Sequence, residues 1–414
     1  MTSPWLIIAD DLTGAADCAI AFAKCGLESV VAWEKHRDAG GVQVLSVDAS
    51  TRRLPPAQAA KLQVEVLAAH YHPGLRLYKK IDSTVRGQPA AELAGLLAYA
   101  PAQFEGRPRL AIVAPAFPGT GRVTVNGSIV VQGVPLEQTP LWARDHTYAS
   151  ANLVEILGSA GLSAEVLPLE DIGHDPEKVL ARLTSARCRG LAAVVCDAKS
   201  EADLAAVATG SLPMADEVIW VGSAGLAAAL ATVETGSAQT AQTPPLLSGQ
   251  KNVLIVVGTL AEASRLQAKT LVETGLVRHL VISPVALFAG PCSPAWQKAS
   301  QELARHFAAH QDVLLELEQA ANPDLSRGAV LSERLAEFVE SAGSSFAGLI
   351  ATGGDTVYAL LSKLGVHSIR LHDEVEPGVP LGITIGAVSI PVVTKAGAFG
   401  DAHSLRRSLE RLHR

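Results

Sequence analysis

The sequence predicts an α/β fold of two domains, each with a mostly parallel sheet covered by helices. Two patterns lead to this prediction: short apolar runs alternate with helical periodicity along the chain, and one polar, aperiodic segment interrupts them past the middle. Of the 414 residues, 48% are hydrophobic and 18% are charged, so the chain can bury large cores. Only 4% are aromatic, which leaves Ala, Val, Leu and Ile to form buried parallel strands.

The N-terminal domain, residues 1–233, alternates strand and helix patterns in the manner of βαβ units, which build parallel sheets. Its strands are predicted at Leu6–Ala9, Val42–Val47, Leu75–Tyr78, Leu110–Ala114, Ala192–Cys196 and Val218–Val221. Its helices are predicted at Gly14–Cys25, Pro56–Ala69, Pro89–Ala98, Pro176–Leu183 and Ala224–Val233.

The segment Arg122–Val134 departs from this alternation, because its apolar residues recur at every second position around Asn126-Gly127. Asn-Gly between two strand-like runs is the strongest short signal for a hairpin turn. We therefore expect an antiparallel hairpin here, near a sheet edge or the rim of the active site.

Residues 234–251 are rich in Ser, Thr, Gln, Gly and Pro and show no periodicity, so we interpret Glu234–Lys251 as a linker. Strand and helix patterns resume in a C-terminal domain, residues 252–414. Its strands are predicted at Val253–Val257, His279–Ile282, Val313–Leu317, Leu349–Ala351 and Ile390–Val393. Substrates commonly bind where domains meet, so we expect an active-site cleft between the two domains.

Composition excludes several classes of function. The formal net charge is −7 and no basic footprint stands out, so nucleic acid is not an expected partner. The five cysteines form no CxxC pair, and no basic stretch precedes the first apolar run. No uncharged apolar stretch reaches the length of about 18 residues that a membrane span needs. These features predict a cytoplasmic protein with reduced thiols.

The first polar motif, IIADDLTGAAD (Ile7–Asp17), lies where a predicted strand runs into a predicted helix. Ligands bind at this edge of open α/β sheets. Asp10 and Asp11 can hold a cation there or accept hydrogen bonds from substrate hydroxyls, although the pair can also serve only as a helix cap. We expect Thr13 to cap the helix and Gly14 to let the backbone come close to a ligand.

A second motif, KKIDSTVRG (Lys79–Gly87), places two lysines, an aspartate, two hydroxyl side chains and an arginine after another strand. Such a mixture can bind a carboxylate and several hydroxyls; a charged surface turn is the plainer alternative. The stretch Asp48–Arg53 also follows a strand, and either Arg52 or Arg53 can clamp a carboxylate with its planar guanidinium.

Three glycine-containing turns follow strands of the C-terminal domain: Gly258-Thr259, IATGGDTVY (Ile350–Tyr358) and KAGAFGD (Lys395–Asp401). Backbone N–H groups at such a bend point at an anion, aided by the dipole of the following helix. Each turn alone is also typical of tight packing, but together they indicate a nucleotide site. No Walker A motif and no G-x-G-x-x-G after a strand is present, and the sequence assigns no metal ligands.

Six blocks of the chain resemble the four-carbon acid sugar kinase family, formerly a domain of unknown function. In order, they are IADDLTGAAD, KKIDSTVRG, APAFPGTGR with its Asn-Gly hairpin, VGSAGLA, ATGGDT and KAGAFGD. The first block is most similar to the D-threonate and D-erythronate kinases. The resemblance implies an N-terminal sugar-acid domain, a C-terminal nucleotide domain, and transfer of the ATP γ-phosphoryl group to the C4 hydroxyl of the acid. For such a transfer we expect Mg²⁺ to bridge the phosphate oxygens.

The same resemblance implies site residues by position. Those for substrate are Asp11, Arg52, Lys80, Ile81, Asp82 and Ser83, with Asp11 and Asp82 as catalytic candidates. Those for ATP are Thr259, Gly353, Gly354, Asp355, Thr356 and Gly397. The resemblance does not say which carboxylate is the general base. Family members often carry Ser at the position of Thr259, and the substitution keeps the hydroxyl.

The first expected substrate is D-threonate, giving 4-phospho-D-threonate and ADP. D-Erythronate and 3-oxo-tetronates are alternatives within the same chemistry. A sugar-acid dehydrogenase or lyase would act without ATP, and a non-catalytic sugar-acid sensor would bind its ligand without turnover. A homodimer is expected only because dimers are the commonest assemblies of soluble proteins.

Overall fold

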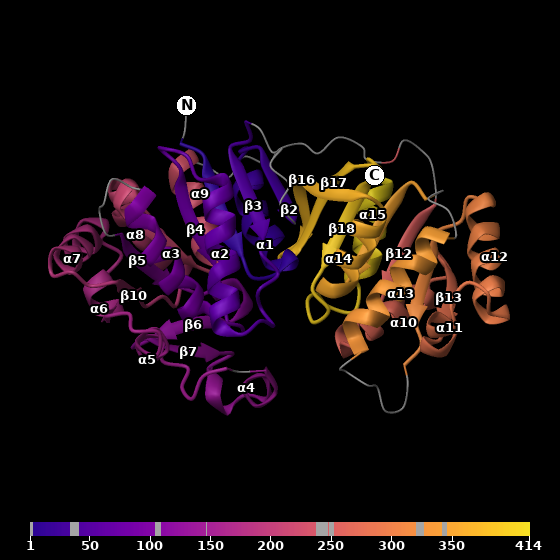
Figure 1. Cartoon of the computed structure of the whole chain (residues 1–414), viewed down its shortest axis with the longest axis horizontal. Helices are drawn as coiled ribbons and strands as arrows, with labels where there is room; N and C mark the ends of the chain where they lie inside the picture. The colour runs from indigo at the N-terminus through magenta and orange to yellow at the C-terminus, as the bar shows by residue number, and fades with distance from the viewer. Residues whose placement is uncertain are drawn as a thin grey trace. The chain divides into compact units, whose positions relative to one another are not determined.

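The structure is a computed structural model of the chain. It describes residues 3–33, 41–103, 109–145, 147–236, 247, 252–319, 327–341 and 346–414. The chain divides into two compact units, Met1–Thr240 (unit 1) and Ala241–Arg414 (unit 2) (Figure 1). Most of the predicted linker Glu234–Lys251 lies outside the described residues, and the predicted cleft between the domains stays a prediction.

Unit 1 is built on a sheet in the strand order β2-β3-β1-β4-β11-β5-β10-β9, in which every neighbouring pair is parallel. The strands are β1 (Trp5–Ala9), β2 (Ser29–Trp33), β3 (Val44–Asp48), β4 (Arg76–Lys80), β5 (Leu110–Ala114), β9 (Ala164–Leu167), β10 (Ala193–Cys196) and β11 (Val218–Gly222). The central strands are buried along their whole length, which explains their runs of Val, Ile, Leu and Ala.

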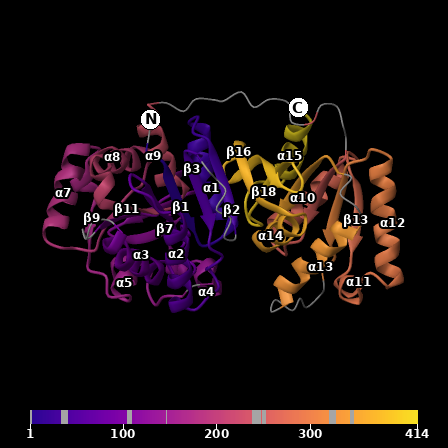
Figure 2. The same ribbon diagram turned by 45° about the horizontal axis from the view of Figure 1, so that its top comes forward.

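Helices cover both faces of this sheet (Figure 2). On one face α1 (Leu12–Lys24), α9 (Ala224–Thr235), α8 (Glu201–Ser211) and α7 (Pro176–Cys188) pack in a row. On the other, α2 (Pro56–His70) packs against α3 (Pro89–Gln103). Shorter helical pieces are α4 (Pro140–Asp145), α5 (Leu153–Gly158), α6 (Leu169–Ile172), η1 (Pro118–Thr120), η2 (Leu136–Gln138) and η3 (Leu212–Glu217).

A small antiparallel sheet of β6 (Arg122–Val125), β7 (Ser128–Val131) and β8 (Val134–Pro135) extends from unit 1. Val125 pairs with Ser128 across a two-residue turn whose members, Asn126 and Gly127, have φ values of 50° and 73°. Positive φ at both positions defines the type I′ turn that Asn-Gly favours. The predicted hairpin is therefore confirmed.

Unit 2 has parallel strands in the order β13-β14-β12-β15-β18, extended by the antiparallel strands β17 and β16. The strands are β12 (Val253–Val257), β13 (Arg278–Ile282), β14 (Val313–Leu317), β15 (Gly348–Thr352), β16 (Val366–Glu376), β17 (Val379–Gly386) and β18 (Pro391–Lys395). The helices are α10 (Glu262–Glu273), α11 (Pro284–Ala289), α12 (Pro294–Ala308), α13 (Gly328–Ser341), α14 (Gly354–Lys363) and α15 (Ser404–His413). In the part of the chain that the structure describes, no helix is long and apolar enough to cross a membrane.

Both units share one topological feature that locates ligand sites. In unit 1 the chain passes from β1 to β2, two strands away, returns to β3 beside β1, and then places β4 on the opposite side of β1. Unit 2 repeats this path with β12, β13, β14 and β15. The strand order thus reverses between β1 and β4, and again between β12 and β15. In open α/β sheets, ligands bind outside the carboxyl ends of the strands at such a reversal.

The mostly parallel α/β fold predicted from the sequence is confirmed, and each predicted strand overlaps an observed one. Among the strands of the described residues, β2, β8, β9, β16 and β17 were not predicted. The long antiparallel pair β16–β17 is only partly buried, and three register shifts interrupt it. Its sequence therefore lacks a clean period of two.

Candidate functional site

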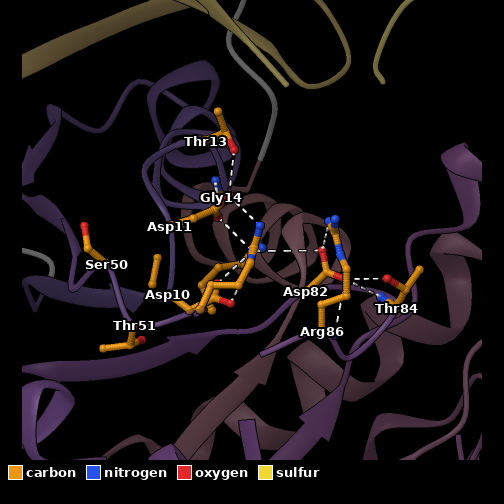
Figure 3. Close-up of polar contacts among 12 residues, drawn as sticks. Asp10, Asp11, Thr13, Gly14, Ser50, Thr51, Asp82, Thr84 and Arg86 are labelled. Atoms are coloured by element: carbon orange, nitrogen blue, oxygen red, sulfur yellow. Dashed lines mark hydrogen bonds and ion pairs between the residues drawn. The ribbon is translucent and has the colours of Figure 1, made fainter. Parts of the chain in front are cut away.

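Charged side chains, among them Asp10, Asp11 and Asp82, cluster at the carboxyl ends of β1, β3 and β4 (Figure 3). The guanidinium of Arg52 joins these aspartates. Arg52 donates to both oxygens of Asp10, from Nε and from Nη2, at 2.8 Å each. It also donates to Asp11, from Nη1 at 2.5 Å and from Nη2 at 2.9 Å. The positive charge that Asp10 and Asp11 bind is therefore the guanidinium of Arg52, a side chain of the same unit.

The backbone explains why these groups meet. The N–H groups of Thr51 and Arg52 donate to the carbonyl of Asp10 at 3.0 and 3.2 Å, which joins the segment after β3 to the end of β1. Asp11 is the N-cap of α1, since its Oδ1 accepts from the Gly14 N–H at 2.9 Å. The prediction that Thr13 caps this helix is wrong: Thr13 donates to Asp11 at 2.9 Å and supports the cap instead. Gly14 is glycine because a Cβ there would lie 2.5 Å from Asp11 Oδ1 and 2.8 Å from Lys80 Nζ.

Asp82 follows β4 and is held by its own loop. Arg86 donates to its two oxygens from Nε at 3.0 Å and from Nη2 at 2.8 Å, and the Thr84 hydroxyl donates to it as well. Arg52 Nη2 lies 4.0 Å from Asp82 Oδ1, so Asp82 belongs to the same charged cluster. Within this loop Val85 has φ 55°, a left-handed conformation that a β-branched residue rarely adopts and that the bonds to Asp82 hold in place.

The charges in this cluster are mutually stabilised. Burial alone would raise the pKa of Asp82, but Arg86, Arg52 and Lys80 outweigh it and hold that pKa well below the ordinary value. Burial likewise opposes ionisation of Asp10, and Arg52 and the two lysines lower its pKa. Asp48 is the exception: burial dominates and raises its pKa to about 7, although Ser50 donates to it at 2.6 and 3.0 Å.

A buried ion pair supports the segments that carry this charged cluster. Lys79, 0% exposed, lies 2.8 Å from Glu92 of α3, which is 1% exposed. Glu92 also accepts from the Thr51 hydroxyl at 2.5 Å, and Gln63 of α2 donates to Thr51 at 2.9 Å. Lys79 further donates to the carbonyl of Lys80 at 2.8 Å. The network therefore ties the segment that carries Arg52 to the strand that carries Lys80.

The structure brings the predicted substrate residues Asp11, Arg52, Lys80 and Asp82 to one edge of unit 1. Ile81 and Ser83, 3% and 6% exposed, lie on the same loop. Arg53, the alternative to Arg52, is exposed. Asp10, Arg86, Glu92 and Arg122 are also connected to this group, and none of them is among the substrate residues that the resemblance implied. Asp10, Arg86 and Arg122 lay inside quoted motifs, whereas no local pattern marked Glu92.

In unit 2 the predicted glycine turns converge on Thr259, at the carboxyl ends of β12, β15 and β18. A Cβ added at Gly353, where φ is +92°, would lie 3.1 Å from the Thr259 Cβ. At Gly397 it would lie 2.6 Å from the Thr259 Oγ1. The Gly353 N–H donates to the carbonyl of Lys395 at 2.9 Å, which joins two of the turns directly. These contacts require glycine for packing, and a residue without a side chain also lets a ligand come close to the backbone.

Helix α14 begins at this point. Its N-cap is Gly353, which offers no side chain to bond the first N–H groups, and a Cβ at Gly354 would meet nothing within 4 Å. Asp355 and the buried Thr356 lie in its first turn. An open helix N-terminus at a strand reversal, with a glycine turn beside it, is suited to a phosphate group.

Lys395, at the end of β18, holds the third glycine turn in shape. Its Nζ donates to the carbonyls of Ala396 at 3.0 Å and Phe399 at 2.8 Å, and to the Ser264 hydroxyl at 3.1 Å. Ser264 in turn donates to the Gly397 carbonyl at 2.7 Å. Burial lowers the pKa of Lys395 to about 8.

The described residues contain no group of three or more His, Cys, Asp or Glu side chains that could hold a metal ion. Mg²⁺ commonly binds through one or two carboxylates together with substrate phosphates and water. The residues of unit 2 fit that mode, because Asp355 stands in the first turn of α14 beside the glycine bend.

Comparison with known proteins matches both halves of the chain. A family model described as a sugar-binding N-terminal domain matches residues 5–230, and one described as a nucleotide-binding C-terminal domain matches residues 254–405. A D-threonate kinase of Cupriavidus necator is 40% identical over 407 residues, which cover 97% of this chain and 96% of that protein. A D-threonate kinase of Bordetella bronchiseptica is 34% identical, with 99% and 98% covered.

A crystal structure from Salmonella typhimurium LT2, described provisionally as a tRNA synthase, has a TM-score of 0.81 to this chain over 98% of each, at 20% identity. At that identity the likeness shows the fold alone. The two family models together span nearly the whole chain, and the sequence relatives cover it from end to end. The chain belongs to the four-carbon acid sugar kinase family.

Proposed function

We propose that this protein is an ATP-dependent kinase that transfers the γ-phosphoryl group to the C4 hydroxyl of a four-carbon sugar acid. D-Threonate is the first candidate, giving 4-phospho-D-threonate and ADP. The observation that carries this proposal is the pair of differently built ligand edges in one chain. Unit 1 offers charged hydrogen-bonding side chains, and unit 2 offers glycine turns and a helix N-terminus. The names of relatives at 40% and 34% identity support D-threonate.

On the substrate side, Asp11 and Asp82 accept hydrogen bonds from hydroxyls of the acid, and Lys80 adds positive charge beside Asp11. Asp82 is held ionised by Arg86 and Arg52, so it orients a hydroxyl well but retains a proton poorly. Phosphoryl transfer through a loose transition state depends mainly on positioning and charge neutralisation. A weakly basic aspartate is sufficient for that role, and either Asp11 or Asp82 can act as the proton acceptor.

On the nucleotide side, the N–H groups of Gly354 and of the Gly397 turn bind phosphate oxygens, with Thr259 and Thr356 beside them. Gly353, whose own N–H donates to the Lys395 carbonyl, shapes the bend. Asp355 would hold Mg²⁺ together with these phosphates. The ion supplies charge neutralisation of the transferring group when bound. Lys395 keeps the Gly397 turn in a fixed conformation, so its N–H groups need no reorganisation when ATP binds.

D-Erythronate and 3-oxo-tetronates remain candidate substrates, because they share the carboxylate, the chain length and the terminal hydroxyl. A cytoplasmic location, where ATP is supplied, and a homodimer stay predictions. A non-catalytic sugar-acid sensor is the alternative of another class, and it predicts binding without turnover.

The proposal is tested by the position of the transferred phosphate and by one variant. We expect ³¹P–¹H correlation spectra of the product to place phosphorus on the C4 methylene. Asp82→Asn keeps the side-chain shape but leaves Arg86 and Arg52 facing a neutral amide. We expect kcat to fall by at least about 100-fold while the thermal transition stays sharp, as for removal of a positioned catalytic group. Phosphate on C2 or C3, or near-normal turnover by this variant, would contradict the assigned roles.

A further inference from the structure

An arginine outside the predicted substrate set reaches the Asp82 loop from the small sheet. Arg122, the first residue of β6, donates from Nη1 to the Ser83 hydroxyl at 2.7 Å. Ser83 is 6% exposed. Because its oxygen accepts this bond, its own proton is available to another acceptor, and none of the described residues is within hydrogen-bonding geometry to take it.

The charge of Arg122 is balanced differently from that of the neighbouring arginines. Arg52 makes its hydrogen bonds to two aspartates, and Arg86 makes a bidentate pair with Asp82. The neighbouring carboxylates raise the pKa of both. For Arg122 burial is the largest influence and lowers the pKa, against the attraction of Asp82 and Asp17.

The hairpin that carries Arg122 is fixed to the main sheet. Asp197, 1% exposed, accepts from the turn N–H groups of Asn126 at 2.6 Å and Gly127 at 2.9 Å. Thr124 and Ala198 exchange two backbone hydrogen bonds, at 2.9 and 3.1 Å. Arg122 itself exchanges two with Phe117. These hydrogen bonds hold the first residue of β6 in place, so the guanidinium of Arg122 is positioned by paired backbone.

We propose that Arg122 and the Ser83 hydroxyl together bind the carboxylate of the four-carbon acid, an inference that rests on the proposed function. A guanidinium beside a hydroxyl donor matches the two oxygens of a carboxylate. The three aspartates of the cluster repel that group and suit the hydroxyls at the other positions of the substrate. In this arrangement Arg52 orients Asp10 and Asp11, and Arg122 binds the carboxylate of the substrate. This arrangement makes the site select aldonic acids over the corresponding neutral polyols.

The test compares D-threonate with D-threitol, a polyol of the same length without the carboxylate. Binding of each is measured by titration calorimetry to the full chain, for the unsubstituted protein and for Arg122→Met. A hydrogen bond to a charged group corresponds to a loss of about 10- to 150-fold in affinity. We expect D-threonate to lose this much in Arg122→Met, whereas D-threitol, which is bound weakly by both proteins, changes by less than about two-fold.

Two further variants keep the test sharp. Arg189→Met removes another arginine of unit 1, one that pairs with Glu165 on the surface at 2.6 and 2.9 Å, and it should leave both affinities unchanged. Ser83→Ala should weaken D-threonate by a smaller factor, with the same selectivity, and it serves if Arg122→Met does not fold. The proposal is overturned if Arg122→Met binds D-threonate normally, or if it loses D-threonate and D-threitol equally.

Failure of the proposed function gives a different pattern. A protein that releases no ADP but binds D-threonate in an Arg122-dependent manner retains the carboxylate site and loses the kinase assignment. A protein that turns over D-threonate equally well with and without Arg122 retains the kinase assignment and loses the carboxylate site.

Discussion

Replacement of Glu92 by Gln isolates the contribution of the buried pair beneath the substrate edge. The substitution preserves shape, and the amide oxygen can still accept from the Thr51 hydroxyl. It removes the negative charge that lies 2.8 Å from Lys79, whose side chain is 0% exposed. Breaking a buried pair by removing one partner destabilises a protein by about 3–5 kcal/mol.

We therefore expect Glu92→Gln to lower the free energy of unfolding of unit 1 by about 4 kcal/mol.

Urea unfolding followed by tryptophan fluorescence measures this effect, because four of the five tryptophans, Trp5, Trp33, Trp142 and Trp220, are in unit 1. The matched control is Glu65→Gln on α2, which removes an exposed pair with Lys61 at 3.9 Å and should change stability by less than about 0.5 kcal/mol. The double variant Lys79→Met, Glu92→Leu should return to within about 1 kcal/mol of the original protein. The reasoning is refuted if Glu92→Gln loses less than about 1 kcal/mol, or if the double variant is as unstable as the single one.

Three further predictions concern other groups. Lys395→Met should raise the KM for ATP at neutral pH. In the unsubstituted protein the KM for ATP should rise only above about pH 8, where Lys395 loses its proton. An identical pH profile of this KM in both proteins would exclude the role of Lys395. Gly353→Ala would force a non-glycine residue to adopt φ +92° and would place its Cβ 3.1 Å from the Thr259 Cβ. It should weaken ATP binding at least about 10-fold by calorimetry without changing D-threonate binding. Burial raises the pKa of Asp48 to about 7, so between about pH 4 and pH 7 the folded protein keeps a proton that the unfolded chain releases. The free energy of unfolding is therefore highest below about pH 4, as far as Asp48 determines it, and falls as the pH rises to 7. Asp48→Asn should therefore flatten the fall of unfolding free energy between pH 5 and 8, by on the order of 3 kcal/mol, and an unchanged slope would contradict the assignment.

Local patterns were sufficient for much of the fold. Val253–Val257 and Val313–Leu317 were predicted with the observed bounds, because buried parallel strands are continuous apolar runs. The Asn126-Gly127 turn followed from the backbone preferences of two residues. The partly polar strand Val366–Glu376 gave no such signal, since its pairing and its register shifts depend on a partner strand.

The candidate site was predictable in its motifs and not in its pairing. Strand ends place Asp11 and Asp82 at one edge whatever else the chain does. The bonds that set their charge connect positions far apart, such as Arg52 with Asp10, 42 residues away, and Arg122 with Ser83, 39 residues away. Thr13 was expected to cap α1 from its residue type, but Asp11 lies one residue before the first helical position and takes that role.

ADP release from the purified protein with ATP and Mg²⁺ is the measurement that separates a sugar-acid kinase from the other classes. The acids to compare are D-threonate, D-erythronate, L-threonate, L-erythronate and the 3-oxo-tetronates. We expect rapid ADP release with one of the four-carbon acids, D-threonate first, and only background release with D-threitol. Folded protein that binds ATP but releases no ADP above background with any of these acids would contradict the kinase assignment.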